Sequence, residues 1–231
     1  MPSTSRSREP HELKPVSLSR KIRVKPGDSW ALIGTKGSGK TTGLKYLDAA
    51  YTRLFPAMRH YVLDSKHDGD FDDWPGRVVS DKAPGLPGPN DRYQVWAPIR
   101  IIPDEVERWL DMVLGDPPAV LEIDELVHLV YKRNSYSDTY NIIQKTGRSL
   151  PIATITLTQE LSRIPPNAYK QSTHVLGFYI REAAEYDRRI LNLLLGAKVD
   201  NPHHPFGLYY QHERGRGEPE YHASIQKFLG A

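Results

Sequence analysis

The 231-residue chain contains 31 Lys and Arg against 28 Asp and Glu, and 39% of its residues are hydrophobic. This length and composition suffice for one sizeable domain with a buried core. The chain has no cysteine, which excludes disulfides, thiolate metal sites and cysteine nucleophiles. Because there is neither a signal segment nor an apolar run of about 18 residues, we expect an unexported, soluble chain that is not an integral membrane protein.

The positive charge is concentrated at the amino-terminal end. Residues 1–25 hold seven Lys and Arg against two Glu, a balance of +5, so the remaining residues carry −2. Residues 1–20 are rich in Ser, Pro and Arg and lack periodicity, which predicts a flexible basic arm before a single domain over residues 21–231. Such an arm can bind nucleic acid or an acidic partner, and a solvated terminus without a role is the alternative.

Short apolar runs alternate with helical patterns along the rest of the chain. Strands are expected at residues 30–34, 60–64, 92–98, 118–126, 151–159 and 173–180. Helices are expected at residues 40–55, 103–114 and 182–195, with a further polar helix before residue 151. The last residues predict a β-hairpin turning at "RGRGEP" and then a short helix. Continuous apolar strands separated by helices predict an α/β fold, in which helices cover both faces of a mostly parallel sheet.

A phosphate-binding loop follows the first expected strand. Residues 34–41, "GTKGSGKT", fit the pattern GxxxxGK[ST] and precede an expected helix. In such a loop the backbone N–H groups and the positive end of the helix dipole face phosphate oxygens. Lys40 would contact the terminal phosphates and the Thr41 hydroxyl would bind Mg²⁺. The expected ATP-binding residues are Gly34, Thr35, Lys36, Gly37, Ser38, Gly39, Lys40, Thr41 and Thr42.

Two acidic residues end the strand expected at residues 118–126. In a P-loop site Asp124 would hold Mg²⁺ through water, and Glu125 would act as general base on the attacking water. An acidic pair at a helix start is the alternative interpretation. A general base for water favours hydrolysis over phosphate transfer to a small molecule, because a kinase must exclude water.

A polar residue also ends the strand expected at residues 151–159. That strand would lie beside the first strand in the additional-strand version of the P-loop fold. Gln159 at its tip would then reach the terminal phosphate and report hydrolysis. An ordinary loop glutamine is the alternative.

Four segments together resemble the HerA–FtsK superfamily of DNA-pumping ATPases. They are "GTKGSGKT", "YVLDSKHDGDF", "AVLEIDEL" and "GRSLPIATITLTQELSRIPPNAYKQSTHVLGFY", in this order over about residues 25–195. The compact size resembles the genome-packaging ATPases of tailless icosahedral viruses with internal membranes. The resemblance implies a three-layer, RecA-like P-loop NTPase fold.

The resemblance also implies a mechanism and partners. It implies a hexameric ring that hydrolyses ATP between subunits and moves double-stranded DNA through its pore, with a capsid vertex or membrane protein as a possible docking partner. The chain would act in the virion or the host cytoplasm. An arginine finger supplied by the neighbouring subunit would be Arg148, just before the sensor strand, with Arg163 as the competing candidate.

Several features depart from the family pattern or stay ambiguous. Lys36 stands where the family more often has glycine, and "QELSR" replaces the commoner Gln-Arg-Pro after the sensor. Residues 128–141 mix cations, amides and aromatic rings, which suits contact with DNA phosphates as much as an ordinary exposed loop. The candidate DNA contacts there are Lys132 and Arg133, with Asn134, Tyr136 and Tyr140.

Two other motifs are assigned no chemistry. The acidic residues Asp68, Asp70, Asp72 and Asp73 lack the closing Glu of a calcium loop and predict a solvated loop. "SKHD" at residues 65–68 is faintly similar to a guanine-recognition motif but follows the wrong strand.

Three alternative functions stay open. The first is a cellular or conjugative DNA pump of the same superfamily. The second is a phosphotransferase acting on a small molecule, which would need an Arg-rich lid that residues 128–141 do not provide. The third is a nucleotide-binding ring component that hydrolyses ATP poorly.

Overall fold

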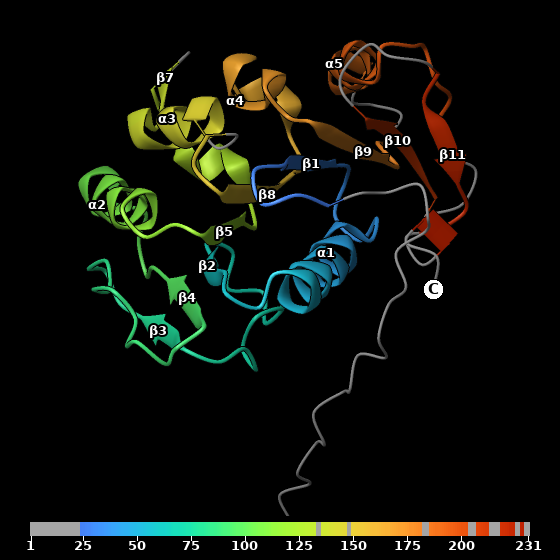
Figure 1. The fold of residues 1–231 in the computed structure, drawn as a ribbon. Coiled ribbons are helices and arrows are strands. Elements are labelled where there is room, and N and C mark those ends of the chain that lie inside the picture. The colour runs from blue at the N-terminus through green and yellow to red at the C-terminus, as the bar shows by residue number, and fades with distance from the viewer. Residues whose placement is uncertain are drawn as a thin grey trace, which may run out of the picture.

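The computed structural model describes residues 24–132, 135–146, 149–181, 185–202, 207–212, 218–224 and 227–228. Its main sheet has nine strands in the order β11-β10-β9-β1-β8-β5-β2-β4-β3 (Figure 1). These strands are β1 (Ser29–Ile33), β2 (Arg59–Leu63), β3 (Arg77–Val79), β4 (Tyr93–Ala97), β5 (Ala119–Ile123), β8 (Ile152–Thr158), β9 (His174–Phe178), β10 (Leu208–His212) and β11 (Glu220–His222). A separate two-stranded ribbon pairs β6 (Val130–Lys132) with β7 (Ser135–Tyr136).

Helices lie on both faces of the main sheet, as the sequence predicts. The α-helices are α1 (Lys40–Leu54), α2 (Pro103–Leu114), α3 (Asp138–Thr146), α4 (Asn167–Lys170) and α5 (Glu185–Leu195), and short 3₁₀ turns are η1 (Leu126–Leu129) and η2 (Leu161–Arg163). Figure 1 shows α1 on one face and the other four α-helices on the opposite face. None of the helices in the described ranges combines the length and the hydrophobicity that crossing a membrane requires.

Strand pairing explains why the apolar runs of the sequence are continuous. Strands β1, β5, β8 and β9 are buried at every position, because helices cover both of their faces. All neighbours from β9 to β3 pair in parallel, whereas β10 and β11 run antiparallel. Strand β8 lies between β1 and β5, which confirms the additional-strand arrangement and the RecA-like architecture.

Two apolar cores hold the three layers together. Under α1, Leu44, Leu47 and Tyr51 pack against one face of the sheet with Trp30 and Leu32. On the opposite face, α2, α3, α4 and α5 bury residues that include Val106, Trp109, Tyr140, Ile143, Ala168, Leu191 and Leu195. Pro103 occupies the first turn of α2, as expected, where its missing N–H costs no hydrogen bond. The carboxyl ends of β1, β8 and β5 therefore meet at one rigid edge.

Three segments differ from their prediction or extend beyond the described residues. Strand β3 is missing from the sequence prediction, because Val78 and Val79 are exposed on an edge strand and show no buried pattern. Residues 126–132 and 135–136 form η1 and the β6–β7 ribbon, within the segment for which an ordinary exposed loop was the alternative. The terminal hairpin is confirmed by β10 and β11, whereas residues 214–217 of its predicted turn at 214–219 and most of the helix after it lie outside the described residues.

Candidate active site

The phosphate-binding loop connects β1 to α1, and its backbone conformation requires glycine at several positions. Gly37 and Gly39 have φ angles of 78° and 96°, in the left-handed region that favours glycine. A Cβ at Gly34 would lie 2.7 Å from the Cβ of Phe178 and 2.8 Å from Ser38 Oγ. The Thr35 N–H donates to the Tyr179 carbonyl at 2.9 Å. Tyr179 directly follows β9, the neighbour of β1, so the end of β9 anchors the loop. The loop thus curls around the start of α1.

Lys40 is the buried cation of this loop. Its Nζ donates to the Thr35 carbonyl at 2.7 Å, so in this state the ammonium is held by the loop itself. The pKa of Lys40 is lowered to about 8, chiefly by burial and also by the charge of Lys66, while the charge of Glu125 acts in the opposite direction. The charges of Lys66 and Glu125 both act on Lys40, so the loop and the acidic strand end are electrostatic neighbours.

Asp124 lies directly after β5 and is 1% exposed. Its Oδ1 accepts hydrogen bonds from the Ser65 hydroxyl at 2.6 Å and the Ser65 N–H at 3.2 Å, and its Oδ2 accepts from the Lys66 N–H at 3.2 Å. Burial raises its pKa to about 6, although Lys66 and Ser65 act in the opposite direction. The carboxyl group is therefore mostly ionised at neutral pH and rigidly oriented.

Glu125 and Gln159 connect the ends of β5 and β8. The Gln159 N–H donates to Glu125 Oε1 at 3.3 Å. Burial raises the pKa of Glu125, while the charge of Lys66 lowers it. A carboxylate with a raised pKa accepts a proton more readily, which is what a general base requires. The structure thus brings together the predicted base and the predicted sensor.

An open pocket of about 380 Å³ lies over this edge. It is lined by Lys36, Gly37, Gly39, Lys40, Thr41, Thr42, Lys66, Asp68, Asp70 and Gln159. Most of the predicted phosphate contacts and the predicted sensor therefore share one pocket. Asp68 and Asp70 also face it, so the prediction that this acidic stretch is only a solvated loop is incomplete.

Lys66 is a site residue that the sequence interpretation missed. Its Nζ lies 3.9 Å from Asp124 Oδ2, and the residue lines the pocket beside Lys40. "SKHD" was compared only with a guanine-recognition motif, although a polar loop after a parallel strand is placed at the carboxyl edge of the sheet. That placement after β2 is the signal that could have identified Lys66.

A second missed feature is a hydrogen-bonded chain behind Asp124. His128 Nδ1 lies 2.6 Å from Ser65 Oγ, which donates to Asp124 Oδ1 at 2.6 Å. Because the Ser65 proton faces the carboxylate, His128 is the donor to Ser65 Oγ. Burial lowers the pKa of His128, and the charges of Lys66 and Arg163 add to this effect. This chain orients Asp124 from behind.

The described donor groups fit the chemistry of a magnesium site. Thr41 supplies a hydroxyl at the pocket, and Asp124 supplies an ionised carboxylate, both of which are hard oxygen ligands of the kind Mg²⁺ prefers. Asp124 lies behind Lys66 and does not itself line the pocket. Thr41 and Asp124 are thus the residues that could hold the ion.

The candidate DNA contacts and the two candidate arginine fingers lie only partly within the described residues. Arg148, Arg133 and Asn134 lie outside the described residues, and of Lys132 only its backbone place in β6 is described. Arg163 ends η2, where its side chain is 64% exposed and pairs with Glu160 at 3.1 Å.

The prediction that Tyr140 contacts DNA is wrong. Tyr140 is fully buried in the core and its hydroxyl accepts a hydrogen bond from Gln144 at 2.7 Å. Tyr136 is partly buried and donates to Asn141 at 3.0 Å. The aromatic residues of this segment therefore pack α3 against the sheet, because helical spacing turns Tyr140 inward.

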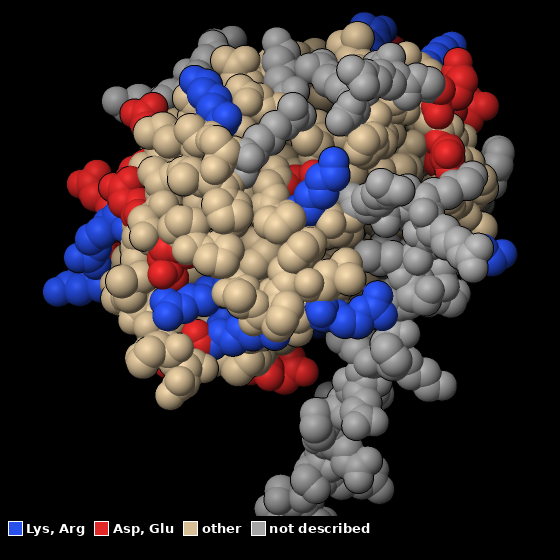
Figure 2. Space-filling model, viewed as in Figure 1, with Lys and Arg blue, Asp and Glu red and all other residues tan. Residues whose placement is uncertain are grey.

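The described charges form no obvious basic stripe on the face shown in Figure 2. There, Lys and Arg side chains lie in separate groups, several of them beside Asp or Glu. Ion pairs of the described residues include Arg59–Asp116 at 2.9 Å and Arg100–Asp81 at 2.6 Å. The described surface in this view therefore does not identify a DNA-binding face.

Comparisons with known proteins agree with this architecture. The sequence matches no protein-family model and no curated protein. The structure is similar to the DNA-packaging ATPase of Sulfolobus turreted icosahedral virus, with a TM-score of 0.65 and 15% identity over 87% of this chain and 99% of that one. The genome-packaging NTPase of Sulfolobus turreted icosahedral virus 2 in complex with ATP-gammaS gives a TM-score of 0.66 at 15% identity, over 87% and 99% of the two chains.

A more distant similarity is to the pCW3 conjugation coupling protein TcpA in a form with ATPgS. Its TM-score is 0.57 at 14% identity, over 90% of this chain and 66% of that one. At such low identities the comparisons establish the fold. The chain therefore shares the fold of these packaging and conjugation proteins.

Proposed function

We propose that the chain hydrolyses ATP to ADP and phosphate. The observation that carries this proposal is the meeting of Lys40, Glu125 and Gln159 at the carboxyl ends of β1, β5 and β8. Glu125 accepts a hydrogen bond from the Gln159 N–H, and its charge influences Lys40. Such an arrangement can bind a terminal phosphate on one side and activate water on the other.

Each residue has a distinct part in the proposed reaction. Lys40 leaves the Thr35 carbonyl and neutralises phosphate oxygens, while the loop N–H groups hold the others. Glu125 orients the attacking water and takes its proton as the water oxygen bonds to the terminal phosphorus and the bond from that phosphorus to the ADP oxygen breaks. Gln159 couples this event to β8 through its backbone. Bound Mg²⁺ would neutralise charge on the phosphates, and Thr41 and Asp124 are the residues to hold it.

We propose further that hydrolysis moves double-stranded DNA, most specifically in packaging a viral genome. The support is the similarity in fold to viral packaging ATPases over nearly their whole length. A homo-oligomeric ring, with six subunits as the family resemblance implies, would place DNA in its pore and could dock on a capsid vertex or membrane protein. The basic arm at residues 1–20 and the cations Lys132 and Arg133 are the proposed DNA contacts, and the virion or the host cytoplasm is the proposed location.

In the proposed ring, an arginine of the neighbouring subunit neutralises charge in the transition state. Arg148 is the first candidate by its place before β8, and Arg163 is the second because its exposed side chain lies near the site. Mixing each alanine variant with wild-type subunits tests this role. A finger acting between subunits predicts that the variant inhibits wild-type rings, and a mixture with additive activities would contradict it.

The experiment that tests the function is ATP turnover with and without duplex DNA. We expect DNA to stimulate the wild-type chain and Lys40→Ala to be inactive under both conditions. Lys82→Ala is the matched control, since Lys82 is exposed and outside the pocket. Phosphate transfer to a small acceptor without DNA would contradict the motor function and support a phosphotransferase. Binding of ATP with negligible turnover would instead support a structural ring component.

A further inference from the structure

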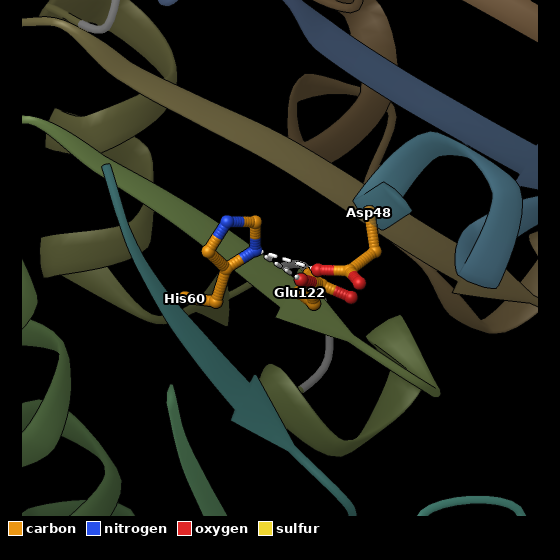
Figure 3. A group of neighbouring side chains, drawn as sticks. All are labelled: Asp48, His60 and Glu122. Atoms are coloured by element: carbon orange, nitrogen blue, oxygen red, sulfur yellow. Dashed lines mark hydrogen bonds and ion pairs between the residues drawn. The ribbon is translucent and has the colours of Figure 1, made fainter. Parts of the chain in front are cut away.

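A group of three ligand-type side chains lies between α1 and the sheet, away from the residues assigned to ATP. Asp48 comes from α1, His60 from β2 and Glu122 from β5, and the three side chains point toward one another (Figure 3). His60 Nδ1 is 2.6 Å from Asp48 Oδ1 and 3.3 Å from Glu122 Oε1. One ligand atom from each residue lies within 4.8 Å of the others.

The two carboxylates of this group are buried together and share His60 as a partner. His60 and Glu122 are completely buried, and the side chain of Asp48 is only 10% exposed. In the described ranges, neither Asp48 nor Glu122 forms an ion pair with a lysine or an arginine. Glu122 Oε2 is buried and has no hydrogen-bond partner among the described residues. Burying two carboxylates is costly unless a cation or a shared proton compensates them, and one divalent ion would supply two positive charges.

The surroundings of His60 resemble those of a metal-binding histidine. Its Nε2 lies 3.3 Å from Thr52 Oγ1, which also lies 2.7 Å from the Tyr93 hydroxyl. The Tyr93 ring stacks on the imidazole at 4.6 Å, and the Tyr93 hydroxyl donates to Asp48 Oδ2 at 3.0 Å. An outer partner for one ring nitrogen fixes the tautomer and turns the other nitrogen, Nδ1, toward the carboxylates.

We propose that Asp48, His60 and Glu122 bind one divalent first-row transition metal ion, with Zn²⁺ as the best probe. The ligands are His60 Nδ1 and one carboxylate oxygen each from Asp48 and Glu122, and solvent entering beside Asp48 completes the set. Imidazole together with carboxylates suits Zn²⁺ or Mn²⁺ better than Mg²⁺, which distinguishes this site from the magnesium site of ATP.

The distances allow such an ion after a small movement. Ligand atoms around tetrahedral Zn²⁺ lie about 3.3 Å apart. The Nδ1–Oε1 separation of 3.3 Å already has this value, whereas the Nδ1–Oδ1 contact of 2.6 Å must open as Asp48 turns. The ion would tie α1, which begins at the phosphate-binding loop, to β5, which ends at Asp124. It would thereby brace the two elements that carry the proposed ATP site.

The test is metal binding by the full chain without nucleotide. The protein is treated with EDTA, desalted and dialysed against about 1 µM Zn²⁺ at pH near 7.5, and bound zinc is measured by mass spectrometry. We expect one zinc per chain. Glu122→Gln and His60→Gln should each weaken zinc binding by at least about tenfold, because each removes a ligand.

Two controls separate this site from the rest of the molecule. Asp124→Asn removes the proposed magnesium ligand, and His67→Gln removes a histidine outside the group, so both should retain one zinc per chain. Far-UV circular dichroism checks that each variant is folded. If a variant fails to fold, X-ray absorption of the zinc-loaded wild-type chain decides, with one nitrogen and two carboxylate ligands expected.

Three results would overturn the proposal. They are no stoichiometric zinc on the wild-type chain, zinc retained by both folded ligand variants, or an absorption spectrum that requires a different ligand set. In each case the three side chains would be a proton-sharing, hydrogen-bonded cluster. None of these results bears on ATP hydrolysis, which is measured with magnesium and nucleotide.

Discussion

Strand β5 carries acidic side chains in two different environments. Glu122 is inside the strand and faces α1, where it meets His60 and Asp48 in a closed, buried group. Asp124 and Glu125 follow the end of the same strand, beside an open pocket that Lys40, Lys66 and Gln159 line. The two sites are only two residues apart in sequence.

The two environments predict different effects of substitution, on ATP turnover at the strand end and on the stability of the fold in the closed group. The strand end is connected to a pocket, so its buried carboxylates can exchange partners with an incoming phosphate and water. The group around Glu122 has no such opening beyond the slight exposure of Asp48. We therefore expect substitutions at the strand end to change turnover, and substitutions in the closed group to change the stability of the fold.

The largest effect is expected for Glu125→Gln. Loss of the general base should reduce ATP turnover by about 10²–10⁴-fold, while nucleotide binding and the thermal midpoint stay close to wild type. Phosphate release and binding of a fluorescent ATP analogue measure the two properties. Glu185→Gln, on the exposed face of α5, is the matched control and should keep full turnover. If Glu125→Gln kept wild-type turnover, Glu125 would not be the general base, and the strand end would not differ from the closed group in its effect on turnover.

A smaller effect, on stability, is expected for Asp48→Ala. Removing this carboxylate breaks its buried contacts with His60 Nδ1 and the Tyr93 hydroxyl, which should lower the free energy of unfolding by about 3 kcal/mol. Urea denaturation in EDTA measures the change. The matched control is Asp72→Ala, because the Asp72 side chain is 65% exposed and pairs with Arg77, so its loss should cost less than about 1 kcal/mol. Equal costs at the two positions would contradict the comparison.

Lys66→Ala should weaken ATP binding by about tenfold, or about 1.4 kcal/mol. The reason is that Lys66 lines the pocket and lies 3.9 Å from Asp124, where it can neutralise phosphate charge. Titration calorimetry measures the affinity, with Lys82→Ala as the control. Unchanged affinity would show that Lys66 only orients Asp124.

The pH dependence of ATP binding tests whether the Lys40 ammonium group binds phosphate. Burial lowers the pKa of Lys40 to about 8, so its ammonium form is present below that pH and is lost as the pH rises through it. Because phosphate binding requires the ammonium form, the dissociation constant should rise by up to about tenfold between pH 7 and pH 9. Lys40→Arg keeps its charge over this range, so its profile should be flat. An equally flat wild-type profile would contradict this role.

Sequence alone predicted the parts of the fold that follow from local patterns. The glycine spacing of residues 34–41 and the apolar runs before Asp124 and Gln159 identified the loop and the two strand ends, and the structure places them at one edge. Helix α2 has the predicted bounds because its Pro start and its amphipathic pattern are both local signals.

Features that depend on packing could not be predicted in this way. Glu122 and His60 are paired by the register of β2 and β5, and Asp48 reaches them only once α1 has packed on the sheet. Tyr140 was assigned to DNA because its neighbours are polar, yet the direction of α3 buries it. Lys66 follows β2 in a loop whose position relative to Asp124 depends on strand order.

The most direct test of the central proposal is movement along DNA. A third strand is annealed to a duplex, and its displacement by the full chain is followed by fluorescence with and without ATP. Coupled translocation predicts displacement that requires ATP and is lost in Glu125→Gln. ATP hydrolysis by the wild-type chain at full rate, with no displacement on any duplex length, would contradict the proposal that this ATPase moves DNA.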